Sequence, residues 1–261
     1  MTPHWFSVFL NLFAIGTGAS MLGVPYKQIG KYYFSFHSTI LLVMVAVAVL
    51  VGSPWQALAH GTAYLKVVAG LSLIYAALVL VQNVVVRAAG EDLRKDSLIL
   101  PVSTGAIFVI MAAFGWTSYG VGKAVLLTFH LLTSAMVLGS SLIAMSTGHW
   151  YLANRALSFD ILIRLCRMFV FSIGAKAVIT AIYAVQRVGE FGRVEDFDKL
   201  VMATRIGAGI VLAVALALMS LACAKRHANQ SATGILYVAV VFVLIGETIS
   251  MYLTLGRNQP I

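Results

Sequence analysis

Three ionisable residues interrupt long runs of apolar residues in this chain: His130, Lys176 and Glu247. An ionisable side chain inside a membrane span is costly, and such residues commonly mark proton relays, ion paths or binding sites. We therefore treat these three residues as the first candidates for chemistry.

Their depths in the expected helices are similar. Lys176 lies 186 − 176 = 10 residues before Gln186, and Glu247 lies 255 − 247 = 8 residues before Leu255, which corresponds to about 12–15 Å of helix. We predict an ion pair or hydrogen-bonded triad of Lys176, Glu247 and His130, because pairing lowers the cost of burying each group. A carboxylate and an imidazole beside an ammonium could carry a proton or bind a quinone carbonyl.

Four histidines suggest a second chemistry. His37 and His149 are expected near one membrane face, and His60 and His130 near the other. Two histidines from different helices can supply the axial ligands of a b-type haem, so the pairs predict two haem sites. His130 and His149, the candidate iron ligands on one helix, are 149 − 130 = 19 residues apart, or about 28 Å along it. The alternative is that these are interfacial or structural histidines.

The elements that must position these residues are membrane-spanning helices. Hydrophobic residues make up 61% of the 261 residues and charged residues only 10%, far from soluble averages. Because the apolar runs are continuous, they predict an all-α, polytopic helix bundle of about eight transmembrane helices, folded as a single domain over residues 1–261. The expected spans are Trp5–Val24, Phe34–Val51, Tyr64–Val86, Leu98–Trp116, Lys123–Ser146, Ile161–Gln186, Met202–Ala224 and Gly234–Leu255.

Small and turn-forming residues support these boundaries and the packing. Pro25 and the sequence Gly52-Ser53-Pro54 favour breaks after the first and second spans. The sequences Gly16-Thr17-Gly18 and Gly207-Ala208-Gly209 present small faces that permit close helix approach.

The positive charge indicates topology rather than nucleic-acid binding, because the basic residues are dispersed among short connections. One side of the membrane is expected to hold ten of them and the other seven, so the first side is predicted to be cytoplasmic. The ten are Lys27, Lys31, Arg87, Arg94, Lys95, Arg155, Arg164, Arg167, Lys225 and Arg226, and the seven are Lys66, Lys123, Arg187, Arg193, Lys199, Arg205 and Arg257. Both termini are then outside, in a bacterial inner membrane.

These patterns favour a redox function. We expect an integral membrane subunit that binds haem b or interacts with quinone, carries electrons, and contacts redox or other complex partners as well as lipid. Two alternatives stay open: a proton-coupled transporter of a small solute that uses Glu247, Lys176 and His130, and a non-catalytic scaffold subunit of a larger complex.

Overall fold

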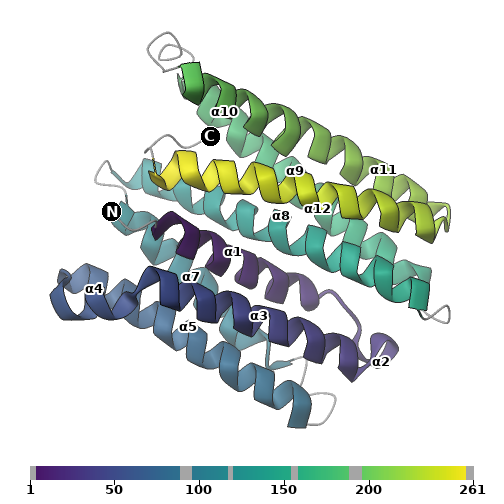
Figure 1. The fold of residues 1–261 in the computed structure, drawn as a ribbon, viewed down its shortest axis with the longest axis horizontal. Helices are drawn as coiled ribbons and strands as arrows, with labels where there is room; N and C mark the ends of the chain where they lie inside the picture. Colours follow the sequence, from purple (N-terminus) through teal and green to yellow (C-terminus); the bar gives the residue numbers. More distant parts are fainter. Residues whose placement is uncertain (1–3, 89–95, 117–119, 154–157, 188–195, 257–261) are drawn as a thin grey trace. The chain divides into compact units, whose positions relative to one another are not determined.

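The computed structural model describes residues 4–88, 96–116, 120–153, 158–187 and 196–256, and these residues are helical apart from short turns (Figure 1). The all-α prediction is confirmed. The elements are α1 His4–Met21, α2 Tyr26–Ile29, α3 Lys31–Gly52, α4 Pro54–His60, α5 Ala63–Ala88, α7 Ile99–Trp116, α8 Val121–Ala153, α9 Phe159–Arg187, α10 Asp196–Ile206, the π-helix η2 Gly207–Leu212, α11 Ala213–Lys225, α12 Asn229–Met251 and the π-helix η3 Tyr252–Gly256.

Six apolar segments are long enough to cross a membrane, and two shorter apolar helices accompany them. The six are Lys31–Gly52, Ala63–Ala88, Val121–Leu152, Phe159–Gln186, Phe197–Lys225 and Asn229–Leu255, and the shorter two are Trp5–Met21 and Ile99–Gly115. This pattern is that of an integral membrane protein, and each of the eight expected spans overlaps one of these helices.

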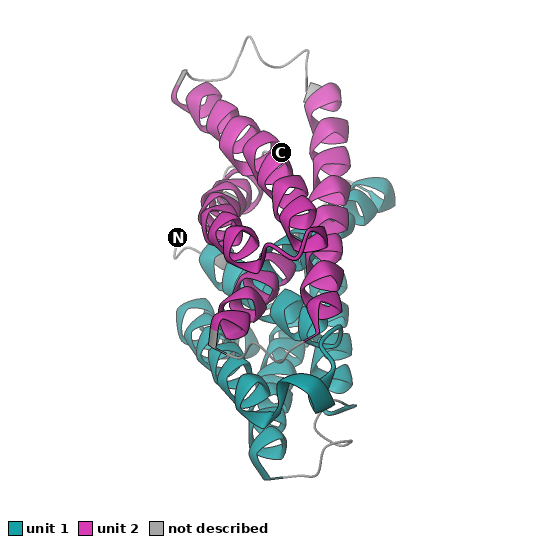
Figure 2. Ribbon diagram, turned by 90° about the vertical axis from the view of Figure 1, so that its right-hand side faces the viewer, with its two compact units in different colours: residues 1–139 teal, residues 140–261 magenta. Residues whose placement is uncertain are grey.

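The chain divides into two compact units, residues 1–139 and residues 140–261 (Figure 2). The division falls within α8, and each unit is described by itself below. The expectation of a single domain stays a prediction.

In residues 1–139, α1, α3, α5 and α7 form a closed ring of contacts, in which α1 packs on α3 and α7 while α5 packs on the same two helices. The first part of α8 approaches α1 closely, because a Cβ atom added at Gly139 would lie 1.9 Å from the carbonyl carbon of Gly16. The predicted small face at Gly16 is therefore a helix-packing site.

The break between α3 and α4 follows the expected turn signal. Ser53 has a positive φ of 44° and ends α3, and Pro54 is the first residue of α4. Proline suits that position because its nitrogen has no hydrogen to leave unpaired at a helix start. The short helix α4 then packs on α5.

In residues 140–261, α11 packs on α9 and α12, and α12 also contacts α10 and η2. A Cβ atom added at Gly209 would lie 2.6 Å from the Cα atom of Gly246. The two glycines therefore allow η2 and α12 to come into backbone contact.

Several expected boundaries were wrong, two of them by six residues or more. The seventh apolar helix begins at Asp196 rather than Met202, and α8 continues to Ala153 rather than ending at Ser146. Arg205 was wrongly counted among the basic residues of one membrane side: it lies within the helical segment Phe197–Lys225, and its side chain is 0% exposed. The basic-residue comparison becomes ten against six.

Candidate functional site

Lys176 and Glu247 form the ion pair that the sequence predicts. Lys176 projects from α9 and Glu247 from α12, and the Lys176 Nζ atom is 3.4 Å from the Glu247 Oε2 atom. Their side chains are 0% and 1% exposed. A pair buried to this degree lies in a medium that strengthens the attraction between the charges but removes their hydration.

Arg205 is a third member of this ion cluster and was not predicted from the sequence. Its Nη2 atom donates a hydrogen bond of 3.0 Å to the Glu247 Oε1 atom. The carboxylate of Glu247 therefore holds one cation at each oxygen. A guanidinium in this position is a strong partner, because the hydrogen bond is charge-assisted and the group keeps its proton.

The three residues lie at matching depths in their helices. Arg205 follows Phe197, the start of its apolar segment, by 205 − 197 = 8 residues, close to the 10 and 8 residues that separate Lys176 and Glu247 from their own helix ends. Each charge is thus about 12–15 Å from a helix end. In the structure, Asp198, Met202 and Arg205 recur at intervals of four and three residues and are all buried, so they share one face of the helix.

The backbone around Arg205 is shaped to admit its side chain. A Cβ atom added at Gly209 would lie 2.8 Å from the Arg205 Nη1 atom, and one added at Gly246 would lie 3.1 Å from it. Gly209 belongs to the π-helix η2, which follows Arg205 by two residues. Such one-turn π segments within apolar helices often accompany functional positions.

The charge of the cluster limits its chemistry. When all three groups are ionised, two cations face one carboxylate and the sum is +1. Arginine keeps its charge in proteins, so the cluster is neutral only when Lys176 has released its proton and Glu247 is ionised. The Nε and Nη1 atoms of Arg205 have no hydrogen-bond partner within the described part of the chain.

His130 is buried, at 0% exposure. Its backbone carbonyl accepts a hydrogen bond of 2.9 Å from the Ser134 hydroxyl on the same helix. Because His130 belongs to residues 1–139 and the ion cluster to residues 140–261, the predicted triad of His130, Lys176 and Glu247 stays a prediction.

The other three histidines differ in exposure. His37 is buried and its Nδ1 atom is 2.8 Å from the Tyr33 carbonyl oxygen. His149 is exposed, and its Nδ1 atom is 2.9 Å from the Tyr237 hydroxyl. His60 is exposed at the end of α4 and lines a cavity in residues 1–139. The haem pairs of His37 with His149 and of His60 with His130 remain predictions.

Polar residues elsewhere on the spans serve helix packing. Thr128 and Thr133 donate hydrogen bonds to carbonyls of their own helix. Ser38 of α3 donates to the Gln82 amide oxygen of α5 at 2.7 Å and accepts from Asn83 at 3.2 Å. The bonds of Ser38 with Gln82 and Asn83 join α3 to α5, as polar side chains commonly do between membrane helices.

Comparisons of the chain with protein-family models, with curated proteins and with solved structures find no match.

Proposed function

We propose that this chain is a proton-coupled transporter of a small solute, with eight membrane spans and the ion cluster of Lys176, Arg205 and Glu247 as its proton site. The observation that carries the proposal is a carboxylate that is 1% exposed and is held by two buried cations in the interior of three apolar helices. Groups of this kind are rare in membrane helices and usually handle ions or protons.

The charge balance identifies the residue that exchanges the proton. Protonation of Glu247 beside Arg205 and a charged Lys176 raises the buried charge of the cluster to +2. Release of a proton from Lys176 lowers it to zero, and the neutral amine can still hydrogen-bond to the carboxylate. We therefore assign the exchangeable proton to Lys176 and the role of fixed counter-ion to Glu247.

Arg205 has a positioning role in this proposal. Its guanidinium occupies the Glu247 Oε1 atom at 3.0 Å and leaves Oε2 to Lys176 at 3.4 Å. The carboxylate is thus held in one orientation while the proton on Lys176 comes and goes. A solute that binds to only one protonation state would couple its own movement to that of the proton.

The test is proton movement in proteoliposomes that contain a pH-sensitive dye. The purified protein is exposed to a pH jump in the presence of panels of amino acids, organic acids, sugars and metal ions. We expect at least one solute to move protons with the wild-type protein. Lys176→Met should lower that rate by about 10²-fold or more, as is typical when a positioned proton-transfer group is removed.

Lys199→Met is the matched control, because Lys199 is an exposed lysine of the same unit and its loss should leave the flux unchanged. A folded wild-type protein that moves no protons with any solute of the panel contradicts the proposal. The same result would leave a scaffold role for the cluster, which predicts co-purification with other subunits.

The redox subunit is a second candidate, favoured by the ring orientation of two histidines. The Nδ1 atoms of His37 and His149 each have a hydrogen-bond partner, and histidines that ligate metals through Nε2 usually use Nδ1 in this way. Bound haem b would supply one-electron chemistry to these residues. A dithionite-reduced minus oxidised visible spectrum, with a haem-to-protein ratio, tests this candidate.

A further inference from the structure

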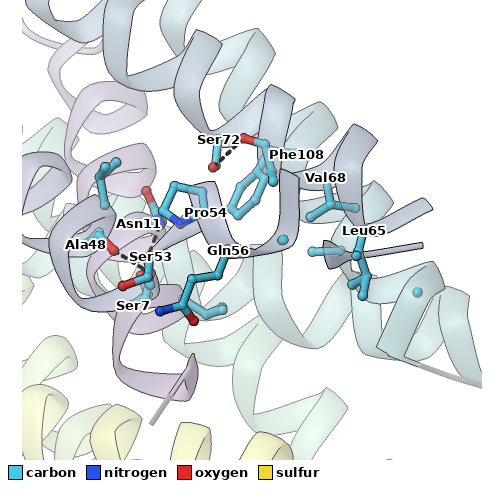
Figure 3. Close-up of a pocket in the computed structure, with 18 of the residues that line it drawn as sticks. Ser7, Asn11, Ala48, Ser53, Pro54, Gln56, Leu65, Val68, Ser72 and Phe108 are labelled. Carbon is cyan, nitrogen blue, oxygen red and sulfur yellow. Dashed lines mark hydrogen bonds between the residues drawn. The ribbon is translucent and has the colours of Figure 1, made fainter. Parts of the chain in front are cut away.

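A cavity of about 590 Å³ lies in residues 1–139, between α1, α3, α4, α5 and α7 (Figure 3). Its walls are mostly apolar, and a small number of polar side chains line it. Cavities of about 300–1,000 Å³ with this composition are typical of small-molecule sites. The cavity is distinct from the ion cluster, which belongs to residues 140–261.

Two side chains of α4 supply the hydrogen-bond donors at the mouth of the cavity. Gln56 and His60 both line the cavity and are exposed. Neither side chain has a hydrogen-bond partner within the described part of the chain. Because they are four residues apart, they stand one turn apart on the same face of α4, with about 5–6 Å between their Cβ atoms. The mouth therefore offers an amide donor and an imidazole donor to one ligand.

The hydroxyl groups of the lining donate their hydrogens to backbone carbonyls instead. Ser7 donates to the Ala48 carbonyl at 2.7 Å, and Ser72 donates to a carbonyl of its own helix at 2.8 Å (Figure 3). Ser53 and Tyr64 also donate to backbone carbonyls. Since these donors are engaged, the cavity away from its mouth offers a ligand mainly apolar contacts.

The cavity extends over about the depth of one membrane leaflet. Along α5 its lining runs from Tyr64 to Ser72, which is 72 − 64 = 8 residues, or about 12 Å of helix. Half of the hydrocarbon core is about 15 Å thick. The helix α4 joins the ends of two apolar spans, α3 and α5, so the mouth lies at the membrane interface. Leu65 of the wall is 49% exposed, and an exposed leucine of a span contacts lipid.

These features fit an amphiphile that has one acyl chain and a carboxylate head. The chain would occupy the apolar part of the cavity, and the two carboxylate oxygens would each accept from one of the two donors of α4. No aspartate or glutamate lines the cavity, so no like charge opposes an anion there. The exposure of Gln56 and His60 keeps the charged head hydrated, which avoids the cost of burying it. An uncharged quinone carbonyl would gain less from these donors, because charge-assisted hydrogen bonds are the stronger ones.

We propose that this cavity binds a long-chain fatty acid, with its carboxylate at Gln56 and His60 and its acyl chain between α5 and α7. The proposal rests on neither the transport function nor the redox candidate. Its failure would therefore leave both of them standing.

Photocrosslinking tests the proposal. The full chain is placed in nanodiscs with a palmitic acid analogue that carries a diazirine near its methyl end, and the cross-linked peptides are identified by mass spectrometry. We expect saturable labelling around Val68 of α5 or Ala112 of α7, which both line the cavity. Excess palmitate should prevent the labelling. Excess 1-hexadecanol, which has the same chain without the carboxylate, should compete about tenfold more weakly, the effect of one or two hydrogen bonds.

Substitutions at the mouth test the role of the two donors. The double variant Gln56→Leu with His60→Leu should bring the preference for palmitate over hexadecanol close to one, because both donors are lost. His60→Gln keeps a donor at its position and should retain the preference. Both residues are exposed, so these variants should keep the helicity of the wild-type protein, which circular dichroism checks.

A pair of variants on α4 tests the location. Ala57→Phe fills the cavity from the half-buried wall of α4 and should abolish the labelling. Ala59→Phe is the matched control: Ala59 is an exposed residue of the same helix that does not line the cavity, and its substitution should leave the labelling unchanged. Equal labelling of the two variants would mean that the probe reports lipid around the protein, and would overturn the proposal.

Three further results would overturn it. One is labelling that excess palmitate does not reduce, and another is equal competition by palmitate and hexadecanol in the wild-type protein. The third is stronger competition by a benzoquinone with a decyl tail than by palmitate, which would assign the cavity to a quinone instead.

Discussion

Glu247 forms ion pairs with two cations, so the three residues of the ion cluster depend on one another. Two of them were predictable, because a lone Lys176 or Glu247 within an apolar run is conspicuous. Arg205 was not, because charged residues such as Asp198 and Lys199 precede it and make it resemble the end of a connection. The sequence also did not predict which histidines are exposed. His37 is buried and His60 is exposed, although both were expected at the ends of spans.

Removal of the shared carboxylate should be the most destabilising single change in the cluster. Glu247→Leu leaves Lys176 and Arg205 buried and facing each other, and breaking a buried pair in this way costs about 3–5 kcal/mol. We expect a corresponding loss in the free energy of unfolding, measured by denaturant titration in detergent micelles with helicity as the signal.

The double variant Glu247→Leu with Lys176→Met should recover part of that loss, because a single buried cation remains. Equal stability of Glu247→Leu and the wild-type protein would show that the cluster is hydrated in the membrane, and would remove the electrostatic basis of the proton-site proposal.

At the scale of helices, the sequence predicted close packing at glycines, but it did not predict which residues of the neighbouring helix pack against them. The sequence marks Gly16 and Gly209 as members of small faces, yet their partners, Gly139 and Gly246, lie far away in the chain. The cavity was not predictable for a related reason: five helices contribute to its wall, and no local pattern reports which side chains of different helices leave space between them.

We expect alanine substitutions at two glycines of residues 1–139 to change stability in opposite directions. A Cβ atom at Gly16 would lie 1.6 Å from the Ala135 carbonyl oxygen, whereas at Gly70 nothing lies within 4 Å. Gly16→Ala should force α1 away from α8 and cost about 1–3 kcal/mol. Gly70→Ala should leave stability unchanged or raise it by up to about 1 kcal/mol, through the better helix propensity of alanine.

Thermal unfolding of the two variants, followed by circular dichroism in the same detergent, checks both signs. A Gly16→Ala protein as stable as the Gly70→Ala protein would mean that α1 and α8 are not in backbone contact at this position.

At the scale of the whole chain, the eight-span topology depends on the two shorter helices. The 18 residues of α1 extend about 27 Å, close to the thickness of about 30 Å that a span must cover. The helix α7 has the same length. If both cross the membrane, the connection at Lys27 lies opposite the N-terminus, and the residues that flank α7 lie on opposite sides. From the corrected comparison of ten basic residues against six, we predict that Lys27 lies in the cytoplasm.

Single-cysteine labelling measures this topology. In a background without Cys166 and Cys223, cysteines are introduced at Lys27, Asp96 and Val121, which are all exposed. A membrane-impermeant thiol reagent applied to intact cells should label Val121→Cys and leave the other two unlabelled until the membrane is opened. Labelling of Asp96→Cys and Val121→Cys from the same side would mean that α7 does not cross. An α7 helix that fails to cross would reverse the orientation of every later helix, including the three that hold the ion cluster.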